Sequence, residues 1–347
     1  MKTKFLQQDL KILSSELEKR GFGKSTILVT GATGLIGSLC IKSITEYNRL
    51  HKNRINVIAL ARNAEKVKKI FLDELENDLL KNVEFIYQDI TEYLNTSMDC
   101  DYIIHTANST TSQYFMTNPV EVIESIYTGT KRILDFAVEK KVKGVVYLSS
   151  MEVFGIVDSE EQITEEQLGY IDIQNIRSCY SEGKRLAELL CKSFAYEYSL
   201  PVKIARLAQT FGAGVSKTED RVFAQFARSA MNGKNIVLHT KGKSFGNYCY
   251  TRDVIKAILL LLQEGKNGDV YTVVNEETTR TIAEMAQMVA EKFSNGKSKV
   301  VFEIPEGNQF GYAPDTKMHL NSQKLRKLGW RPEISLEEMY RRMLPEL

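Results

Sequence analysis

The chain has few of the residues that mark several common protein classes. Its 347 residues include five cysteines, an odd number with no C-x-x-C pair, which argues against a disulfide framework or a zinc cluster and favours a reducing compartment such as the cytoplasm. The four histidines are scattered without ligand spacing, so no metal site is predicted. The most apolar run, residues 257–262, is far too short to span a bilayer.

Excess charge is also missing. The 46 basic and 44 acidic residues leave a formal net charge of +2, which provides no broad basic field for nucleic acid or for an anionic membrane. Charges recur along the first twenty or so residues without an uninterrupted apolar stretch, so a signal peptide is not expected. The remaining class is an ordinary globular protein, expected in the cytoplasm, with neither nucleic-acid nor membrane partners.

What the chain does contain is a regular alternation of short apolar strands and helices. An amphipathic helix is predicted over residues 3–20, more simply packed on the main domain than forming a dimer contact. Strands are predicted at residues 26–30, 56–61, 83–87, 102–105, 144–149 and 202–207, with helices at 35–47, 120–140 and 177–198. Continuous apolar strands separated by helices predict an α/β fold, a Rossmann-type doubly wound parallel sheet covered on both faces.

A glycine-rich segment joins the first of these strands to the next helix. Gly31, Gly34 and Gly37 lack side chains, which lets the turn close, lets backbone N–H groups approach a pyrophosphate, and lets the helix pack on the sheet. Three glycines alone fit any tight turn, but their position between strand and helix favours dinucleotide binding. The candidate cofactor contacts in this loop are Gly31, Thr33, Gly34, Leu35, Ile36 and Gly37.

The ends of the following strands bear on the choice of dinucleotide. The strand at residues 56–61 ends without a carboxylate to bind the ribose, and Arg62 can instead pair with a 2′-phosphate, so NADP is favoured over NAD. The simpler alternative for Arg62 is a solvated side chain. Asp89 and Ile90 follow the third strand, where an adenine contact is expected; the alternative for Asp89 is a turn aspartate. Ala107, after the fourth strand, is a further candidate cofactor contact.

The domain boundaries follow from this organisation. Residues 1–24 are predicted to form a helical extension and residues 25–207 the dinucleotide-binding domain. After residue 207 the alternation weakens, so residues 208–247 and 276–347 are predicted to form a smaller mixed region that binds substrate. Residues 248–275, with the pattern strand, helix, strand, are expected to return to the main sheet.

Tyr180 and Lys184 are candidates for the chemistry. They lie four residues apart on a predicted helix and therefore share a face. A nearby ammonium group favours the phenolate and lowers the pKa of a tyrosine, which suits a general acid or base. Ser150, at the end of the strand 144–149, is placed to hydrogen-bond the same substrate oxygen. Helix or turn capping is the alternative for Ser150, and chance spacing is the alternative for the Tyr–Lys pair.

Three sequence segments together resemble a known family. They are T-G-A-T-G-L-I-G at residues 30–37, S-S-M-E-V-F-G at 149–155 and R-S-C-Y-S-E-G-K-R at 177–185, supported by Asn118-Pro119, Gly129-Thr130 and residues 328–332. The chain is similar to the extended short-chain dehydrogenase/reductase superfamily, in its NAD(P)-dependent nucleotide-sugar epimerase/dehydratase group, over about residues 25–345. The tyrosine segment is similar to that of UDP-glucuronate decarboxylases.

The resemblance implies a nucleotide-sugar substrate and roles for individual residues. Ser150 and Tyr180 would bracket a sugar hydroxyl or ketone, and Lys184 would support Tyr180 and hold the nicotinamide ribose. Tyr180 and Lys184 are therefore candidate cofactor contacts as well. Glu152 stands where the decarboxylases also carry a glutamate, and it joins the candidate catalytic residues. The candidate substrate contacts are Ser150, Met151, Gln209 and Arg221. Met151 cannot donate a proton, which disfavours a dehydratase. A homodimer through helices 120–140 and 177–198 is also implied.

Three departures from the family pattern limit the resemblance. Arg62 follows the second strand, where decarboxylases and epimerases usually have an acidic residue for NAD. Gly246 replaces an arginine that contacts the diphosphate, and the candidate substitutes are Arg221, Arg228 and Lys243. Ile126 replaces an asparagine three residues before Gly129.

Other features have simpler interpretations. His105 and Cys179 are expected to be structural residues, and residues 66–69, with three lysines, are expected to form a solvated helix face.

The leading hypothesis is an enzyme that transfers hydride at a sugar carbon, C4, as an epimerase, decarboxylase or 4-keto reductase. Arg62 favours a reductase that consumes NADPH, whereas Glu152 and the surroundings of Tyr180 favour an enzyme that recycles its dinucleotide. The alternative is a non-catalytic regulatory or binding protein that responds to a dinucleotide. Gly246 and Ile126 favour this alternative, and the intact set Ser150, Tyr180 and Lys184 opposes it.

Overall fold

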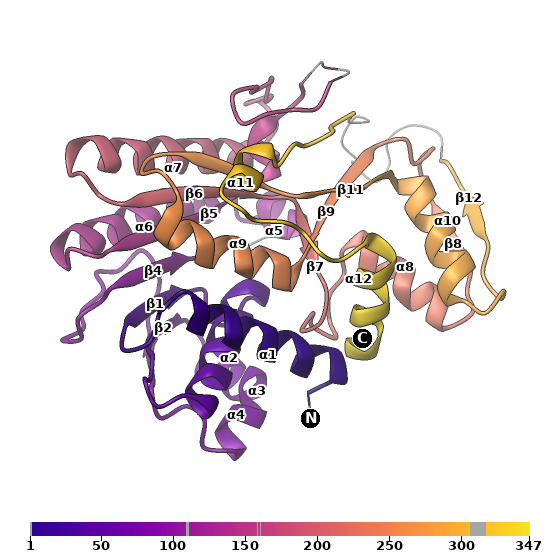
Figure 1. Ribbon diagram of the computed structural model, residues 1–347. Helices are drawn as coiled ribbons and strands as arrows, with labels where there is room; N and C mark the ends of the chain where they lie inside the picture. The colour runs from indigo at the N-terminus through magenta and orange to yellow at the C-terminus, as the bar shows by residue number, and fades with distance from the viewer. Residues whose placement is uncertain (1, 109–110, 158, 160, 306–316) are drawn as a thin grey trace.

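A seven-stranded sheet forms the centre of the molecule in the computed structural model, which describes residues 2–108, 111–157, 159, 161–305 and 317–347 (Figure 1). All its strands pair in parallel, in the order β10-β6-β5-β4-β1-β2-β3. The strands are β1 (Thr26–Thr30), β2 (Asn56–Ala61), β3 (Val83–Tyr87), β4 (Tyr102–His105), β5 (Gly144–Ser150), β6 (Val202–Leu207) and β10 (Val270–Val273). The predicted α/β doubly wound fold is confirmed, and the strand order reverses between β1 and β4, where such sheets bind ligands.

Helices cover both faces of this sheet because consecutive strand residues point to opposite sides. On β1, Ile27 and Val29 pack with α1 (Lys4–Lys19), α2 (Leu35–Leu50) and α9 (Thr251–Glu264). Leu28 faces the other way and packs with α6 (Pro119–Glu139) and α7 (Ser178–Glu197). The predicted helices therefore exist, within three residues of their expected ends. Two short helices, α3 (Ala64–Ile70) and α4 (Leu72–Glu76), follow β2.

The N-terminal helix α1 is part of the main core. Its apolar face, made by Leu6, Leu10, Leu13 and Leu17, is buried with residues of α2 and α9. Asp9 is buried on the same helix. Its carboxylate accepts hydrogen bonds from Tyr250 Oη at 2.5 Å and from the guanidinium groups of Arg252 and Arg342 at 3.2 Å. The interpretation of α1 as a helix packed on the main domain is confirmed.

The region after β6 forms two small sheets. The first contains β7 (Gln209–Phe211), β9 (Phe245–Tyr250) and β11 (Asn275–Thr281), and the second contains β8 (Ile236–Leu238) and β12 (Val300–Phe302). Helices α8 (Val222–Met231), α10 (Ile282–Phe293), α11 (Gln323–Lys327) and α12 (Leu336–Met343) accompany them. In Figure 1, α8, α10, β8 and β12 lie together at the end of the molecule furthest from α6 and α7.

The prediction for residues 248–275 was only partly right. Strand β10 joins the main sheet beside β6, and α9 covers that sheet, as expected. Strand β9 instead lies in the three-stranded sheet, parallel to β7 and antiparallel to β11. The reason is that β7 begins two residues after β6 ends, so it presents an unpaired edge to β9 outside the main sheet. The region after β6 as a whole has the mixed character that was predicted for it.

In the described ranges, no helix is long and apolar enough to cross a membrane, and no cluster of histidine, cysteine, aspartate and glutamate is placed to hold a metal ion. All five cysteines are free thiols, and Cys179 is the least buried of them. A short helix α5 (Ser112–Thr117) and the 3-10 turn η1 (Met151–Phe154) follow β4 and β5, at the edge where the cavities open.

Candidate active site

Two connected cavities lie at the carboxyl ends of the central strands. The first has a volume of about 730 Å³ and begins at the glycine loop, where Gly31, Thr33 and Gly34 line it. The second has a volume of about 570 Å³ and is lined by residues of β5, η1, α7 and β7. Gly34, Thr106 and Asn108 line both cavities. The arrangement is a continuous cleft across the point where the strand order reverses.

Two of the three glycines in the loop, Gly31 and Gly37, leave no room for a side chain. Gly31 has a φ of +65°, and a Cβ there would lie 2.6 Å from Thr106 Oγ1 and 2.9 Å from Ala107 Cα. A Cβ on Gly37 would lie 2.4 Å from the carbonyl oxygen of Gly31. The loop is therefore folded tightly against the end of β4, and its backbone is exposed to the first cavity. These residues fit a dinucleotide whose pyrophosphate lies along the start of α2.

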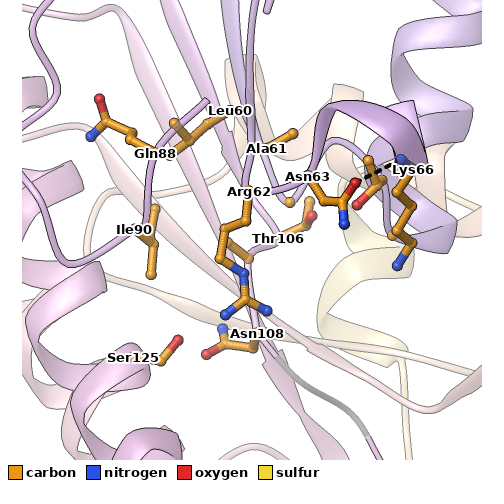
Figure 2. Close-up of a pocket in the computed structure, with 14 residues that line it drawn as sticks. Leu60, Ala61, Arg62, Asn63, Lys66, Gln88, Ile90, Thr106, Asn108 and Ser125 are labelled. Atoms are coloured by element: carbon orange, nitrogen blue, oxygen red, sulfur yellow. Dashed lines mark hydrogen bonds between the residues drawn. The ribbon is translucent and has the colours of Figure 1, made fainter. Parts of the chain in front are cut away.

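The far end of the first cavity carries positive charge. Arg62 and Lys66 both line it, and among its described lining residues there is no carboxylate. Figure 2 shows the Arg62 guanidinium pointing toward the Asn108 side chain. The Asn63 side chain accepts a hydrogen bond from the backbone N–H of Lys66 at 2.9 Å. This cap fixes the first turn of α3, and with it the backbone position from which the Lys66 side chain extends. Lys66 is exposed on α3, as the prediction of a solvated helix face requires, and it also lines this cavity.

Asp89 lies next to Arg62 at the edge of a third, smaller cavity of about 270 Å³. Its Oδ2 is 3.6 Å from Arg62 Nη1, and its Oδ1 accepts hydrogen bonds from the backbone and hydroxyl of Thr91. The pair is exposed, so it stabilises little. The guanidinium therefore remains available to a ligand anion. Ile90 and Ala107 line the first cavity, as the prediction of cofactor contacts requires.

The four residues predicted to carry the chemistry, Ser150, Glu152, Tyr180 and Lys184, line the second cavity together. Ser150 ends β5, while Tyr180 and Lys184 lie one helical turn apart on α7. The Tyr180 ring stacks on Phe115 of α5, with the ring centroids 4.4 Å apart, and its side chain is buried. Lys184 Nζ donates a hydrogen bond to Leu148 O at 2.7 Å and lies 5.8 Å from the centre of the Tyr180 ring. Phe115 carried no signal in the sequence, because α5 was not predicted.

The protonation states of this pair differ from the expectation. Burial raises the pKa of Tyr180, Glu152 raises it further, and Ser150 and Arg177 oppose the change. The expected lowering by Lys184 was wrong for the ligand-free protein, because the ammonium group points to Leu148 and burial dominates. Burial also lowers the pKa of Lys184 to about 7, with Glu188 opposing it. At neutral pH Tyr180 is therefore a neutral phenol that can donate a proton.

Glu152 is held by an ion pair at the rim of the same cavity. Arg177 donates to both of its carboxylate oxygens, at 2.7 and 2.9 Å, and Ser181 Oγ donates at 3.2 Å. A carboxylate bound in this bidentate way is an acceptor with a fixed direction. The Glu152 carboxylate therefore has a fixed orientation in the lining of the second cavity. Arg177 lines the second cavity, although it was not predicted as a site residue.

The predicted substrate contacts Met151, Gln209 and Arg221 also line the second cavity. Arg221 pairs with Glu219 through two contacts of 2.8 Å, so its charge is already balanced. Arg228 and Lys243 are absent from the described lining of all three cavities. A Cβ on Gly246 would lie 2.1 Å from Tyr248 Oη, so the buried Tyr248 side chain occupies the space that an arginine at this position would need.

His105 and Ile126 have structural surroundings. His105 bridges Thr30 Oγ1 at 2.7 Å and Thr130 Oγ1 at 3.2 Å, and burial lowers its pKa to about 3, so the ring is neutral. Ile126 packs against Gly183 of α7, where a Cβ would lie 3.1 Å from Ile126 Cδ1. An apolar contact between α6 and α7 thus occupies the position of the family's asparagine.

Comparisons with known proteins agree with this arrangement. The model of a family described as "NAD dependent epimerase/dehydratase family" matches residues 27–275. UDP-glucuronic acid decarboxylase 6 of Arabidopsis thaliana is 28% identical over 315 residues, which cover 90% of this chain and 85% of the relative.

Solved structures share the fold. An epimerase of Methanothermobacter thermautotrophicus has a TM-score of 0.74 at 22% identity, covering 96% of this chain and 95% of that one. A dTDP-glucose 4,6-dehydratase of Bacillus anthracis, in complex with NAD, has a TM-score of 0.71 at 19% identity, covering 93% and 96%.

Proposed function

Because the chain belongs to the NAD-dependent epimerase/dehydratase family, we propose that it is an enzyme that transfers hydride at a carbon, C4, of the sugar in a nucleotide sugar. The observation that carries this proposal is the common position of Ser150, Tyr180 and Lys184 in a cavity that continues into the glycine-loop cavity. The names of the similar curated proteins, which are decarboxylases and dehydratases of nucleotide sugars, favour an enzyme over a non-catalytic binding protein.

Each part of the cleft has a role in this proposal. Residues 25–207 and β10 bind the dinucleotide, through the loop from Gly31 to Gly37, Arg62, Asp89, Ile90 and Ala107. Residues 208–247 and 276–347 cover the sugar nucleotide. The dinucleotide, when bound, supplies the hydride donor or acceptor. Tyr180 gives a proton to, or takes one from, the reacting oxygen, and Ser150 hydrogen-bonds that oxygen. Glu152, fixed by Arg177, orients a sugar hydroxyl group, and Met151, Gln209 and Arg221 contact the substrate.

Two forms of the reaction are supported by different observations. A reductase that consumes NADPH is supported by Arg62 and Lys66 in the first cavity, and by the neutral phenol of Tyr180, which is ready to protonate a ketone. An epimerase or decarboxylase that recycles its dinucleotide is supported by the Glu152–Arg177 pair and by the similarity to decarboxylases.

A single set of incubations separates the two forms. The purified protein is mixed with NADPH and a panel of 4-keto nucleotide sugars, and separately with 4-hydroxy nucleotide sugars, including UDP-glucuronate, without added reductant. Loss of NADPH absorbance indicates the reductase. A new sugar nucleotide in the second incubation, detected by mass spectrometry, indicates the recycling enzyme. Dinucleotide binding without turnover of any sugar would instead favour the non-catalytic protein.

The Arg62→Ala variant is expected to lose affinity for NADP but not for NAD. A charge-assisted contact with a 2′-phosphate contributes about 1.5–3 kcal/mol, so the dissociation constant of NADP should rise about ten-fold or more. Fluorescence titration with both dinucleotides measures the ratio. Lys68→Ala is the control, because it removes an exposed lysine of the following helix, α3, that is paired with Glu65. An unchanged preference in Arg62→Ala would remove the argument for NADP.

The second partner that we propose is another copy of this chain. Apolar side chains are exposed on the outer faces of the two neighbouring helices: Ile123 (45%) and Tyr127 (39%) on α6, and Leu186 (44%) and Leu189 (61%) on α7. Two such faces packed around a twofold axis would bury these side chains. Leu189→Glu is therefore expected to convert a homodimer to a monomer in light scattering. Leu50→Glu, at the exposed end of α2, should leave the mass unchanged, and a monomeric wild type would contradict the dimer.

A further inference from the structure

A buried cluster of charged and polar groups lies directly beneath the candidate active site. Glu188 of α7 accepts a hydrogen bond from Ser149 Oγ at 2.5 Å and is bound by Arg206 of β6 at 2.8 to 3.2 Å. The remaining Arg206 nitrogen, Nη1, donates to Glu165 O at 2.8 Å. The side chains of Glu188 and Arg206 are only 8% and 4% exposed. Neither the proposed roles nor the sequence motifs account for this cluster.

Stability alone does not explain such a pair. Removing two charges from water costs several kcal/mol per ion, and well-packed apolar residues in place of a buried ion pair are often neutral or stabilising. The location of the cluster points to another role, because it contacts both elements that carry the chemistry. Ser149 precedes Ser150 on β5, and Glu188 lies one helical turn after Lys184 on α7.

Two adjacent bonds join these elements. Lys184 donates to Leu148 O, and Ser149 donates to Glu188, so consecutive residues of β5 are tied to positions one turn apart on α7. The next residue of the strand is Ser150, and the preceding turn of the helix carries Tyr180. The two bonds therefore set the position of Ser150 relative to Tyr180. A shift of about 1 Å between reacting groups is enough to cost a large part of the rate.

We propose that Glu188 is a positioning residue for the reaction: held by Arg206 and Ser149, it locks the end of β5 against α7 and provides the negative charge that Lys184 faces. The inference rests on the proposed function for its kinetic readout.

The charge on Glu188 matters because the tyrosine, histidine and cysteine side chains around Lys184 are neutral. Tyr147 of β5 lies under the ammonium, 4.6 Å from Nζ to the ring centre, and burial raises its pKa. His105 of β4 is neutral, with a pKa of about 3, and burial raises the pKa of the Cys191 thiol and that of the Tyr180 phenol. The Arg206 guanidinium is bound to Glu188 rather than to Lys184. Glu188 is thus the neighbouring carboxylate that favours the ammonium form of Lys184.

Removing the charge of Glu188 should lower the pKa of Lys184. A carboxylate favours the charged form of a lysine, so its removal lowers the lysine pKa. Glu188→Gln keeps the shape of the side chain and deletes the charge. The pKa of Lys184, about 7 in the intact protein, should fall by about one unit. Less ammonium would then be present at neutral pH, and the alkaline limb of turnover should move to lower pH.

The direct test is a titration of Lys184 in the ligand-free protein. Carbon-13 labelling of the lysine side chains gives an NMR signal for each ammonium group, and Lys184→Arg assigns the signal of interest. The expected result for Glu188→Gln is a lower titration midpoint and about a ten-fold lower kcat, with dinucleotide affinity changed less than about three-fold. Glu182→Gln is the matched control, since Glu182 lies on the same helix in a partly exposed pair with Arg185. It should leave all three quantities unchanged.

A second variant covers the case in which Glu188→Gln does not fold. Ser149→Ala removes only the hydroxyl that joins β5 to Glu188 and keeps every charge. It should lower kcat about ten-fold without moving the midpoint of Lys184. Wild-type kcat in Ser149→Ala, or an unmoved midpoint in folded Glu188→Gln, would overturn the proposal. Absence of turnover in the wild type would instead contradict the proposed function, while the NMR titration would still report on Glu188.

Discussion

Replacing Tyr180 with phenylalanine is expected to lower kcat by about 10²–10⁴-fold, the range that a positioned general acid or base contributes. In the proposed reaction the phenol exchanges a proton with the reacting sugar oxygen, and its raised pKa keeps it neutral at pH 7. Phenylalanine keeps the stack on Phe115, whose centroid lies 4.4 Å from the Tyr180 ring, so the fold of the site should persist. The measurement is steady-state turnover together with dinucleotide titration.

The comparison with other positions makes this result specific. Tyr196 lies on the same helix α7 and is 93% exposed, so Tyr196→Phe should keep wild-type kcat. Dinucleotide affinity in Tyr180→Phe should change by less than about three-fold, because the lost hydroxyl acts on the sugar. Near-normal turnover in Tyr180→Phe would mean that another group moves the proton.

Replacing Gly37 with alanine is expected to abolish dinucleotide binding and to destabilise the fold. The new Cβ would lie 2.4 Å from the carbonyl oxygen of Gly31, which is backbone and cannot rotate away. Either α2 moves off the sheet or the loop opens, and overpacking of this kind costs about 1–3 kcal/mol. Both movements displace the backbone that faces the first cavity. Thermal unfolding and NADPH fluorescence measure the two effects.

The neighbouring residue provides a control for this prediction. Ser38 is also on the first turns of α2, and its hydroxyl bonds only to Leu35 O within its own helix. Ser38→Ala should keep its dinucleotide affinity and most of its stability. A Gly37→Ala protein with wild-type affinity would show that the loop adapts to a side chain, and the argument for a tight pyrophosphate loop would be lost.

The sequence predicted those parts of the molecule that depend on local patterns. Strands β1 to β6 are short and wholly or mostly apolar, so their positions followed from composition. The order of the motifs at their ends was enough to bring Gly34, Ser150 and Tyr180 into one cleft. Strand β9 was misplaced because its partners, β7 and β11, are three and seven residues long and carry no clear alternation.

The parts that could not be predicted depend on contacts between distant residues. Lys66 looked like one of three lysines on a helix, and its approach to the first cavity follows from the cap made by Asn63. In the sequence alone, Glu188 is an ordinary glutamate of a predicted helix, and Arg206 is an arginine near the end of a predicted strand. Their pairing, 18 residues apart, needs the packing of α7 on β6. The pKa of Tyr180 was also misjudged, because burial cannot be read from a motif.

The contacts of Asp9 have a consequence for the order of folding during translation. The partners of Asp9, Arg252 and Arg342, follow it in the sequence by 243 and 333 residues. At a translation rate of about 5–20 residues per second, the carboxylate waits on the order of tens of seconds for them. Until α9 has been synthesised, the leucine face of α1 can pack on α2 but not on α9. We therefore expect the ion pairs of Asp9 to form late in folding, when Arg252 of α9 and Arg342 of α12 reach α1.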